Sequence, residues 1–251
     1  VYGVSLVAAV LAAALLLLAR GTTRVRVAAV AVMAALALAT AVLGPRRWTE
    51  PDGAPLRVAL VQGAVPQLLK WQPGERRATM ELYRSLTEGI TGADLVVWPE
   101  AAIPAPADMV AGYLDELGEL ARARGMQLLV GILTHDERTG EYYNSLLAVG
   151  APAGAYHKRH LVPFGEFFPV PAFVRSWMRM MNLPYSDLSR GADRQAPLLV
   201  RGTGLAPTIC YEDAYGAEQL VFQPAAGVLV NVSNDAWFGD TLAPHQHLQI
   251  A

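Results

Sequence analysis

The stretch "ADLVVWPE", residues 93–100, is a near-continuous apolar run that ends in a proline and a carboxylate. Such a run is typical of a strand buried on both faces, as in a sheet covered by helices. Further short apolar runs, bounded by turn residues, lie on either side of it and predict more strands: "LRVALVQG" (56–63), "MQLLVGIL" (126–133) and "EYYNSLLAVG" (141–150).

Two helices are predicted between these strands. The segment 74–90, "GERRATMELYRSLTEGI", has the spacing of an amphipathic helix. Its apolar face is expected to comprise Met80, Leu82, Tyr83 and Leu86. The segment 107–125, "ADMVAGYLDELGELARARG", ends at Gly125, as the C-terminus of a helix does. This alternation of strands and helices predicts an α/β domain.

The later part of the chain continues the same pattern. "PLLVRGTGLAPTICYE" (197–212) is expected to form a hairpin-like pair of strands, "AYGAEQLVF" (214–222) a short helix, and "AAGVLVNVSND" (225–235) another strand.

The first 44 residues contain no acidic side chain and two long apolar runs, 1–19 and 27–44. As a helix each run is about 27 Å long, close to the thickness of the hydrocarbon core of a bilayer. A cleaved signal peptide is disfavoured, because the first run is long, lacks a charged leader and is followed by the second. We expect two transmembrane helices over 1–44, a Pro/Gly-rich linker over 45–55 and a folded domain over 56–251.

The chain begins at Val1 rather than Met and ends after "HLQIA", so we expect it to be a piece of a longer polytopic protein. The three arginines in "RGTTRVR" favour a cytoplasmic position for the loop between the helices, which puts residues 45 onward outside. Beyond the membrane segments the chain carries 17 basic and 22 acidic side chains without a basic patch. That charge argues against nucleic acid as a partner.

Three of the predicted strands are followed by a chemically marked residue: Glu100, Lys158 or Cys210. In open α/β folds functional groups gather at the carboxyl ends of strands. Each residue alone has an ordinary explanation, as a solvated acid, a surface lysine or a buried structural thiol. Lys158 is unusual because the chain has two lysines against 18 arginines. Cys210 lies where backbone N–H groups and a helix dipole are expected to favour a thiolate.

Together these three residues predict a thiol nucleophile with a carboxylate base and an ammonium group for a developing oxyanion. Histidine is the more common base, and none of the five histidines is excluded, although none is expected to follow a strand end as Glu100 does. They are His135, His157, His160, His245 and His247.

Four motifs in register resemble the carbon–nitrogen hydrolase (nitrilase) superfamily and, within it, the apolipoprotein N-acyltransferase family. The motifs are "LVVWPEAAIP" (95–104), "KRHLVPFGEFFP" (158–169), "CYED" (210–213) and "NVSNDAWFGD" (231–240). The resemblance implies a nitrilase-like α-β-β-α sandwich preceded by transmembrane α-helices, on the outer face of the bacterial cytoplasmic membrane. The catalytic domain of that family continues further, so the resemblance implies that the domain over 56–251 is truncated at its C-terminus.

The resemblance also implies roles for individual residues. Cys210 would be the nucleophile, Glu100 the general base and Lys158 the oxyanion partner. The supporting residues would be Glu166, Tyr211, Glu212 and Asn144. The substrate-binding residues would be Trp71, Phe173, Trp177 and Trp237. The implied reaction, which needs no metal or cofactor, moves a fatty acyl chain from a phospholipid to the N-terminal amine of a diacylglyceryl-cysteine apolipoprotein through a cysteine thioester. The protein is expected to act as a monomer.

The segment 167–184, "FFPVPAFVRSWMRMMNLP", has a large apolar surface with arginines on its other side. The pattern alone fits a core helix as well as a membrane-dipping arm. The family resemblance favours the arm.

Two other functions remain open from the sequence. A membrane-tethered amidase acting on a small amide would share Glu100, Lys158 and Cys210 but would need a closed polar pocket. A lipid or lipoprotein receptor would have no need of all three residues.

Overall fold

The computed structural model describes residues 2–48, 50–51, 53–72, 74–150, 152–170, 174 and 187–251. The chain divides into two compact units, residues 1–54 and residues 55–251. Each unit is described by itself.

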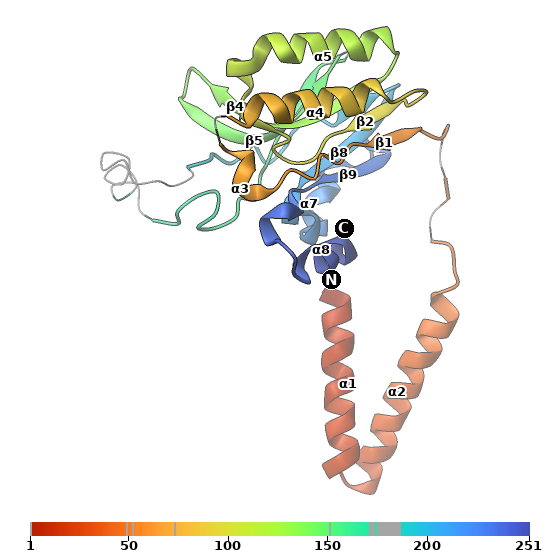
Figure 1. Ribbon diagram of the computed structural model, residues 1–251. Helices are drawn as coiled ribbons and strands as arrows, with labels where there is room; N and C mark the ends of the chain where they lie inside the picture. The colour runs from red at the N-terminus through yellow and green to blue at the C-terminus, as the bar shows by residue number, and fades with distance from the viewer. Residues whose placement is uncertain are drawn as a thin grey trace. The chain divides into compact units, whose positions relative to one another are not determined.

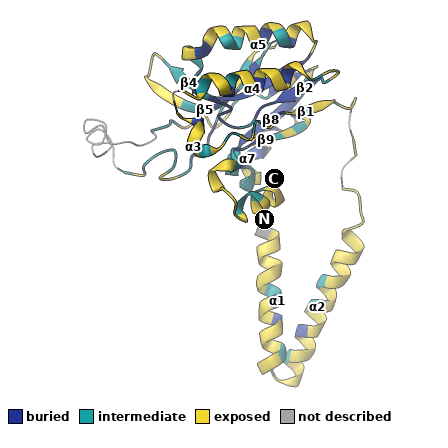
Figure 2. Cartoon of the chain, in the orientation of Figure 1, coloured by how far each residue is buried: buried dark blue, intermediate teal, exposed yellow. Residues whose placement is uncertain are grey.

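The first unit is a pair of helices that contact each other, α1 (Tyr2–Arg20) and α2 (Thr23–Leu43). Both are long and apolar enough to cross a membrane. Figure 2 shows that nearly all of their surface is exposed, as expected for helices whose apolar side chains face lipid. The connection between them is shorter than the predicted loop, so Arg24 and Arg26 lie in the first turns of α2.

The second unit is built on two sheets (Figure 1). The larger sheet has the strand order β1-β2-β4-β5-β6, and β3 also pairs with β4. The strands β1, β2 and β4 are parallel, whereas β5 and β6 are antiparallel to their neighbours. The bounds are β1 Val58–Leu60, β2 Leu95–Val97, β3 Ile103–Pro106, β4 Gln127–Asp136, β5 Glu141–Val149 and β6 Gly154–His157. The strands predicted from the apolar runs are therefore confirmed, mostly with shorter bounds.

The smaller sheet has the order β7-β8-β9, with β7 (Leu198–Val200) antiparallel and β9 (Val228–Val232) parallel to β8 (Thr203–Ile209). The predicted hairpin and the strand after it are thus confirmed. Short helices connect and follow these strands: η2 Cys210–Ala214, α7 Gly216–Gln219, η3 Leu220–Phe222, η4 Asp235–Phe238 and α8 Ala243–Ile250.

The layers follow from the two hydrophobic cores. Helices α4 (Arg76–Glu88) and α5 (Ala111–Ala123), the latter preceded by η1 (Ala107–Val110), cover one face of the larger sheet and enclose the first core. The smaller sheet packs on the opposite face and encloses the second core. Because side chains alternate along a strand, Leu199 and Leu229 point away from that second core, and both are exposed.

Helix α4 buries only part of the predicted face. Tyr83 is buried and Met80 packs against the first core, as expected. Leu82 and Leu86 are exposed instead, and Thr79 and Thr87 are buried. The cause is a hydrogen bond that the apolar pattern does not reveal. Trp98 Nε1 donates to Thr87 Oγ1 at 2.9 Å, and Thr87 Oγ1 donates to the Tyr83 carbonyl oxygen at 2.8 Å. These bonds turn the threonine side of the helix toward the sheet.

Candidate active site

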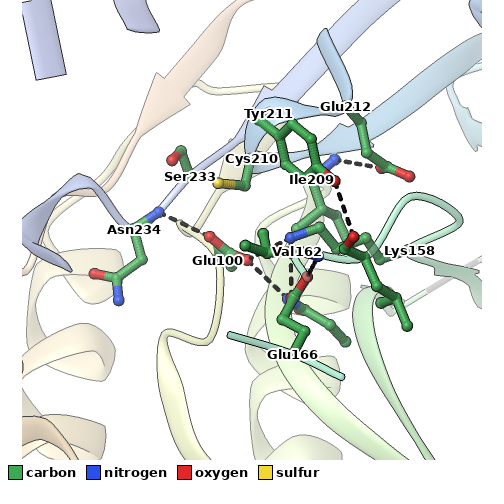
Figure 3. Close-up of polar contacts among 12 residues, drawn as sticks. Glu100, Lys158, Val162, Glu166, Ile209, Cys210, Tyr211, Glu212, Ser233 and Asn234 are labelled. Carbon is green, nitrogen blue, oxygen red and sulfur yellow. Dashed lines mark hydrogen bonds and ion pairs between the residues drawn. The ribbon is translucent and has the colours of Figure 1, made fainter. Parts of the chain in front are cut away.

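Three strand ends bring Glu100, Lys158 and Cys210 together. Glu100 follows β2 by three residues, Lys158 directly follows β6, and Cys210 directly follows β8. Figure 3 shows their side chains converging from the two sheets. His160 follows the end of β6 by three residues, as Glu100 follows β2, so the expectation that no histidine does so is wrong. His157 is the last residue of β6. Its ring lies 2.8 Å from Ser145 Oγ.

Lys158 is almost fully buried, and its charge is matched by two carboxylates. Its Nζ lies 2.9 Å from Glu166 Oε1 and 3.3 Å from Glu100 Oε1. Burial alone would lower the pKa of Lys158, but the negative charges of Glu100 and Glu166 outweigh burial and raise it. A permanently charged ammonium therefore lies beside the Glu100 carboxylate.

Asn144 and Asn234 fix the orientation of Glu100. Asn144 Nδ2 donates to Glu100 Oε1 at 2.7 Å and to Glu166 Oε1 at 2.8 Å. The backbone N–H of Asn234, just past β9, donates to Glu100 Oε2 at 3.0 Å. Glu166 is held in turn by the backbone N–H of Val162, at 2.8 Å. Both carboxylates are thus held in place by neighbouring donors.

Cys210 stands at the turn between β8 and η2 with a backbone φ of +57°. This left-handed conformation is uncommon for a residue other than glycine, and such strain is concentrated at functional sites. The thiol is partly buried, and its pKa is raised to about 11 by burial and by the charge of Glu100. The predicted preference for a thiolate is therefore wrong, because those two effects exceed the influence of the N–H donors. At neutral pH the sulfur keeps its proton until a base removes it.

Glu212 joins the cysteine segment to the lysine segment. Its Oε1 accepts the backbone N–H groups of Arg159 and His160, at 2.7 and 3.0 Å. Its Oε2 accepts the backbone N–H of Ile209 at 2.8 Å and the hydroxyl of Tyr156 at 2.9 Å. With all four donors in place, this buried carboxylate sets the spacing between the two loops.

Tyr211 lies between the same two segments. Its hydroxyl donates to the Leu161 carbonyl oxygen at 2.9 Å. Lys158 Nζ lies 5.8 Å from the centre of the Tyr211 ring, within the range of a cation–π contact.

Lys70, the other lysine of the chain, was missed by the sequence analysis. It ends α3 (Gln67–Lys70), is buried, and donates from Nζ to the Glu100 carbonyl oxygen at 3.3 Å. Burial lowers the pKa of Lys70 to about 8. The rarity of lysine in this arginine-rich chain was the signal that could have drawn attention to it.

The predicted substrate-binding residues fall into two groups. Trp71 and Trp237 are exposed, Trp71 directly after α3 and Trp237 in η4. Phe173 and Trp177, with most of the predicted arm, lie outside the described residues.

No group of three or more His, Cys, Asp or Glu side chains suited to a metal ion occurs among the residues that the structure describes.

The site has a thiol, an ammonium and a carboxylate just past the ends of strands, with the second carboxylate, Glu166, in the loop after β6. This combination defines the class of the protein. The chain belongs to the carbon-nitrogen hydrolase family, whose model matches residues 57–251. The fold agrees. A CN-hydrolase superfamily protein from Xanthomonas campestris superposes with a TM-score of 0.50 at 21% sequence identity, over 71% of this chain and 64% of that chain.

More particularly, the chain is similar to proteins named apolipoprotein N-acyltransferase. It is 44% identical to that of Methylococcus capsulatus over 206 residues, which are 82% of this chain and 41% of the relative. It is 41% identical to that of Pseudomonas aeruginosa over 207 residues, 81% of this chain and 40% of the relative. The chain thus spans about two fifths of the length of these curated relatives.

Proposed function

We propose that this chain carries the catalytic domain of an N-acyltransferase that moves a fatty acyl chain from a phospholipid to the N-terminal amine of diacylglyceryl-cysteine apolipoproteins. The observation that carries the proposal is the convergence of Glu100, Lys158 and Cys210, with Lys158 Nζ 3.3 Å from Glu100 Oε1. The names of the relatives support the substrate class.

In the first half-reaction Glu100 takes the proton from the Cys210 thiol as the sulfur attacks the ester carbonyl carbon of the phospholipid. The negative charge moves to the carbonyl oxygen, where the Lys158 ammonium and the backbone N–H of Tyr211 stabilise it. Collapse of this intermediate breaks the ester C–O bond. The leaving oxygen takes the proton back from Glu100, so a lysophospholipid departs and Cys210 is left as a thioester.

In the second half-reaction the acceptor amine attacks the thioester carbonyl carbon, and Glu100 takes a proton from the amine nitrogen. The same donors stabilise the second oxyanion. The C–S bond then breaks, the amide forms, and Glu100 returns the proton to the sulfur. A raised thiol pKa suits this scheme, because the resting cysteine is a protonated thiol whose proton the base must accept.

Glu166, Asn144, Tyr211 and Glu212 support this chemistry. Glu166 and Asn144 orient Lys158 and Glu100, while Tyr211 and Glu212 tie the lysine segment to the cysteine segment. No step calls for a metal or an organic cofactor.

The acyl donor implies a membrane setting. We place α1 and α2 in the bacterial cytoplasmic membrane, the catalytic domain on its outer face, and the protein as a monomer within a longer polytopic chain. The exposed rings of Trp71 and Trp237 suit contact with lipid, since tryptophan is enriched at membrane interfaces. The arm containing Phe173 and Trp177 would add to that contact.

The test is to trap the thioester. The full chain, purified in detergent, is mixed with vesicles of one defined phospholipid, and the Cys210 peptide is weighed by mass spectrometry. The proposal expects a mass increase equal to that acyl chain, and none in Cys210→Ala. A small-amide hydrolase would show amide hydrolysis without a fatty-acyl adduct, and a lipid receptor would bind vesicles equally well with Cys210→Ala.

A further inference from the structure

A second cluster of polar side chains lies near Cys210 and takes no part in the proposed acyl transfer. Its centre is His247 on α8, which lies between two carboxylates. His247 Nδ1 lies 2.8 Å from Asp235 Oδ1 in η4, and His247 Nε2 lies 3.3 Å from Asp213 Oδ2 in η2. The side chains of His247 and Asp213 are largely buried.

Ser233 connects this cluster to the sulfur. Its Oγ donates to Asp235 Oδ1 at 2.7 Å and also lies 3.3 Å from His247 Nδ1. The Ser233 hydroxyl also helps to lower the pKa of the Cys210 thiol. Figure 3 shows Ser233 beside the Cys210 sulfur atom. A row of polar contacts therefore runs from Ser233, which lies beside the thiol, through Asp235 to His247 and Asp213.

The charges make His247 the residue on which this cluster depends. The Asp213 side chain is buried, and among the described residues its ion-pair partner is the His247 imidazole, 3.3 Å away. Burial alone would lower the pKa of His247, but the hydrogen bond to Asp235 and the charge of Asp213 outweigh it and raise the pKa. When it is protonated, His247 supplies the positive charge between Asp213 and Asp235.

We propose that His247 is a positioning residue for Cys210: held between Asp213 and Asp235, it fixes Asp235, which holds the Ser233 hydroxyl against the thiol. In the resting state the Ser233 oxygen accepts the S–H group while its own proton is shared with Asp235. When Glu100 removes the thiol proton, the hydroxyl can turn and donate to the sulfur anion. This inference rests on the proposed nucleophilic role of Cys210.

The test measures thiol reactivity without any lipid. The full chain in detergent micelles is alkylated with iodoacetamide at pH values from 6 to 11, and modification of Cys210, the only cysteine, is followed by mass spectrometry. Ser233→Ala and His247→Gln should each shift the pH dependence of the alkylation rate to higher pH, by about half a unit or more. That shift slows alkylation about threefold at a fixed pH below the thiol pKa. The exposed His245→Gln, on the same helix, should match the unmodified protein.

The double variant decides whether His247 acts through Ser233. The combined change should shift the profile no further than Ser233→Ala alone, because the path is already broken. Additive shifts, or a folded His247→Gln with an unchanged profile, would overturn the proposal. If His247→Gln does not fold, Asp235→Asn replaces it in the same cycle. Because alkylation needs no acyl donor, this result is independent of whether the thioester with phospholipid forms.

Discussion

Glu166 Oε1 lies 2.9 Å from Lys158 Nζ, closer than the 3.3 Å that separates Lys158 Nζ from Glu100 Oε1. The ammonium group is therefore held by one carboxylate while it faces another. In the proposed reaction, Glu100 would exchange its proton while Lys158 stays bound to Glu166.

Glu166→Gln should slow thioester formation on Cys210 by about tenfold to a hundredfold, because a charge-assisted hydrogen bond to Lys158 becomes a neutral one. The rate is measured by mass spectrometry with a defined phospholipid. The exposed Glu137→Gln serves as the control and should react at the normal rate. Equal rates in the two variants would show that Glu166 does not position Lys158.

Glu100→Gln should change the two reactions of Cys210 in opposite directions. The charge of Glu100 helps to raise the thiol pKa to about 11, so its removal should lower that pKa and speed iodoacetamide alkylation at pH 9 severalfold. The acyl adduct should be lost, because the base is gone. Both reactions are followed on the same peptide. Slower alkylation would contradict the electrostatic account of the raised pKa.

Lys70→Met should stabilise the folded chain by about 1–3 kcal/mol at pH 7, because a buried ammonium with a lowered pKa is costly to keep charged. The folded pKa is about 8 and the ordinary value 10.5. Between these values the unfolded chain binds more protons, so the stability of the unmodified protein rises with pH and the advantage of the variant shrinks. Thermal unfolding in detergent at pH 7 and pH 10 measures this difference.

The control for Lys70→Met is Arg122→Met, which removes an exposed cation. Its effect should be small and should not change with pH. A Lys70→Met advantage that is as large at pH 10 as at pH 7 would mean that the gain comes from packing rather than from charge.

Gly131→Ala, a change in the neighbouring strand β4, should displace Glu100. A methyl group at Gly131, in β4, would lie 2.8 Å from Glu100 Cα and would overlap the Pro99 carbonyl oxygen. Overpacking of this kind costs about 1–3 kcal/mol, and the displaced carboxylate should slow thioester formation. Gly112→Ala in α5, where a methyl group meets nothing within 4 Å, should leave the adduct rate unchanged. Normal kinetics in a folded Gly131→Ala would disprove this close packing.

Much of the fold could be predicted, because buried strands are encoded as local apolar runs in the sequence. The strands β2, β4 and β8 are short apolar runs in the sequence, and Glu100 and Cys210 could be noticed because they break such runs. The burial of Thr87 in α4 could not be predicted in the same way. It depends on a hydrogen bond between Trp98 and Thr87, which a hydrophobic pattern does not contain.

The pKa shifts in the site could not be predicted from the sequence, for a related reason. The pKa of Cys210 depends on Glu100, which is 110 positions away along the chain, and on burial by both sheets. The environments of Lys70 and His247 likewise arise only when distant segments meet. Residue types and strand ends can be recognised locally, whereas their charges and partners require the folded chain.

The carboxylate of Glu212 fastens the lysine loop and the cysteine loop to one another from within the protein. The spacing between the Lys158 segment and the Cys210 segment is therefore set by the fold itself. If the proposed function holds, the preference for one acyl chain or headgroup can change at exposed side chains such as Trp71 and Trp237 while this internal spacing stays the same. The proposed reaction and its substrate preference would then depend on different parts of the fold.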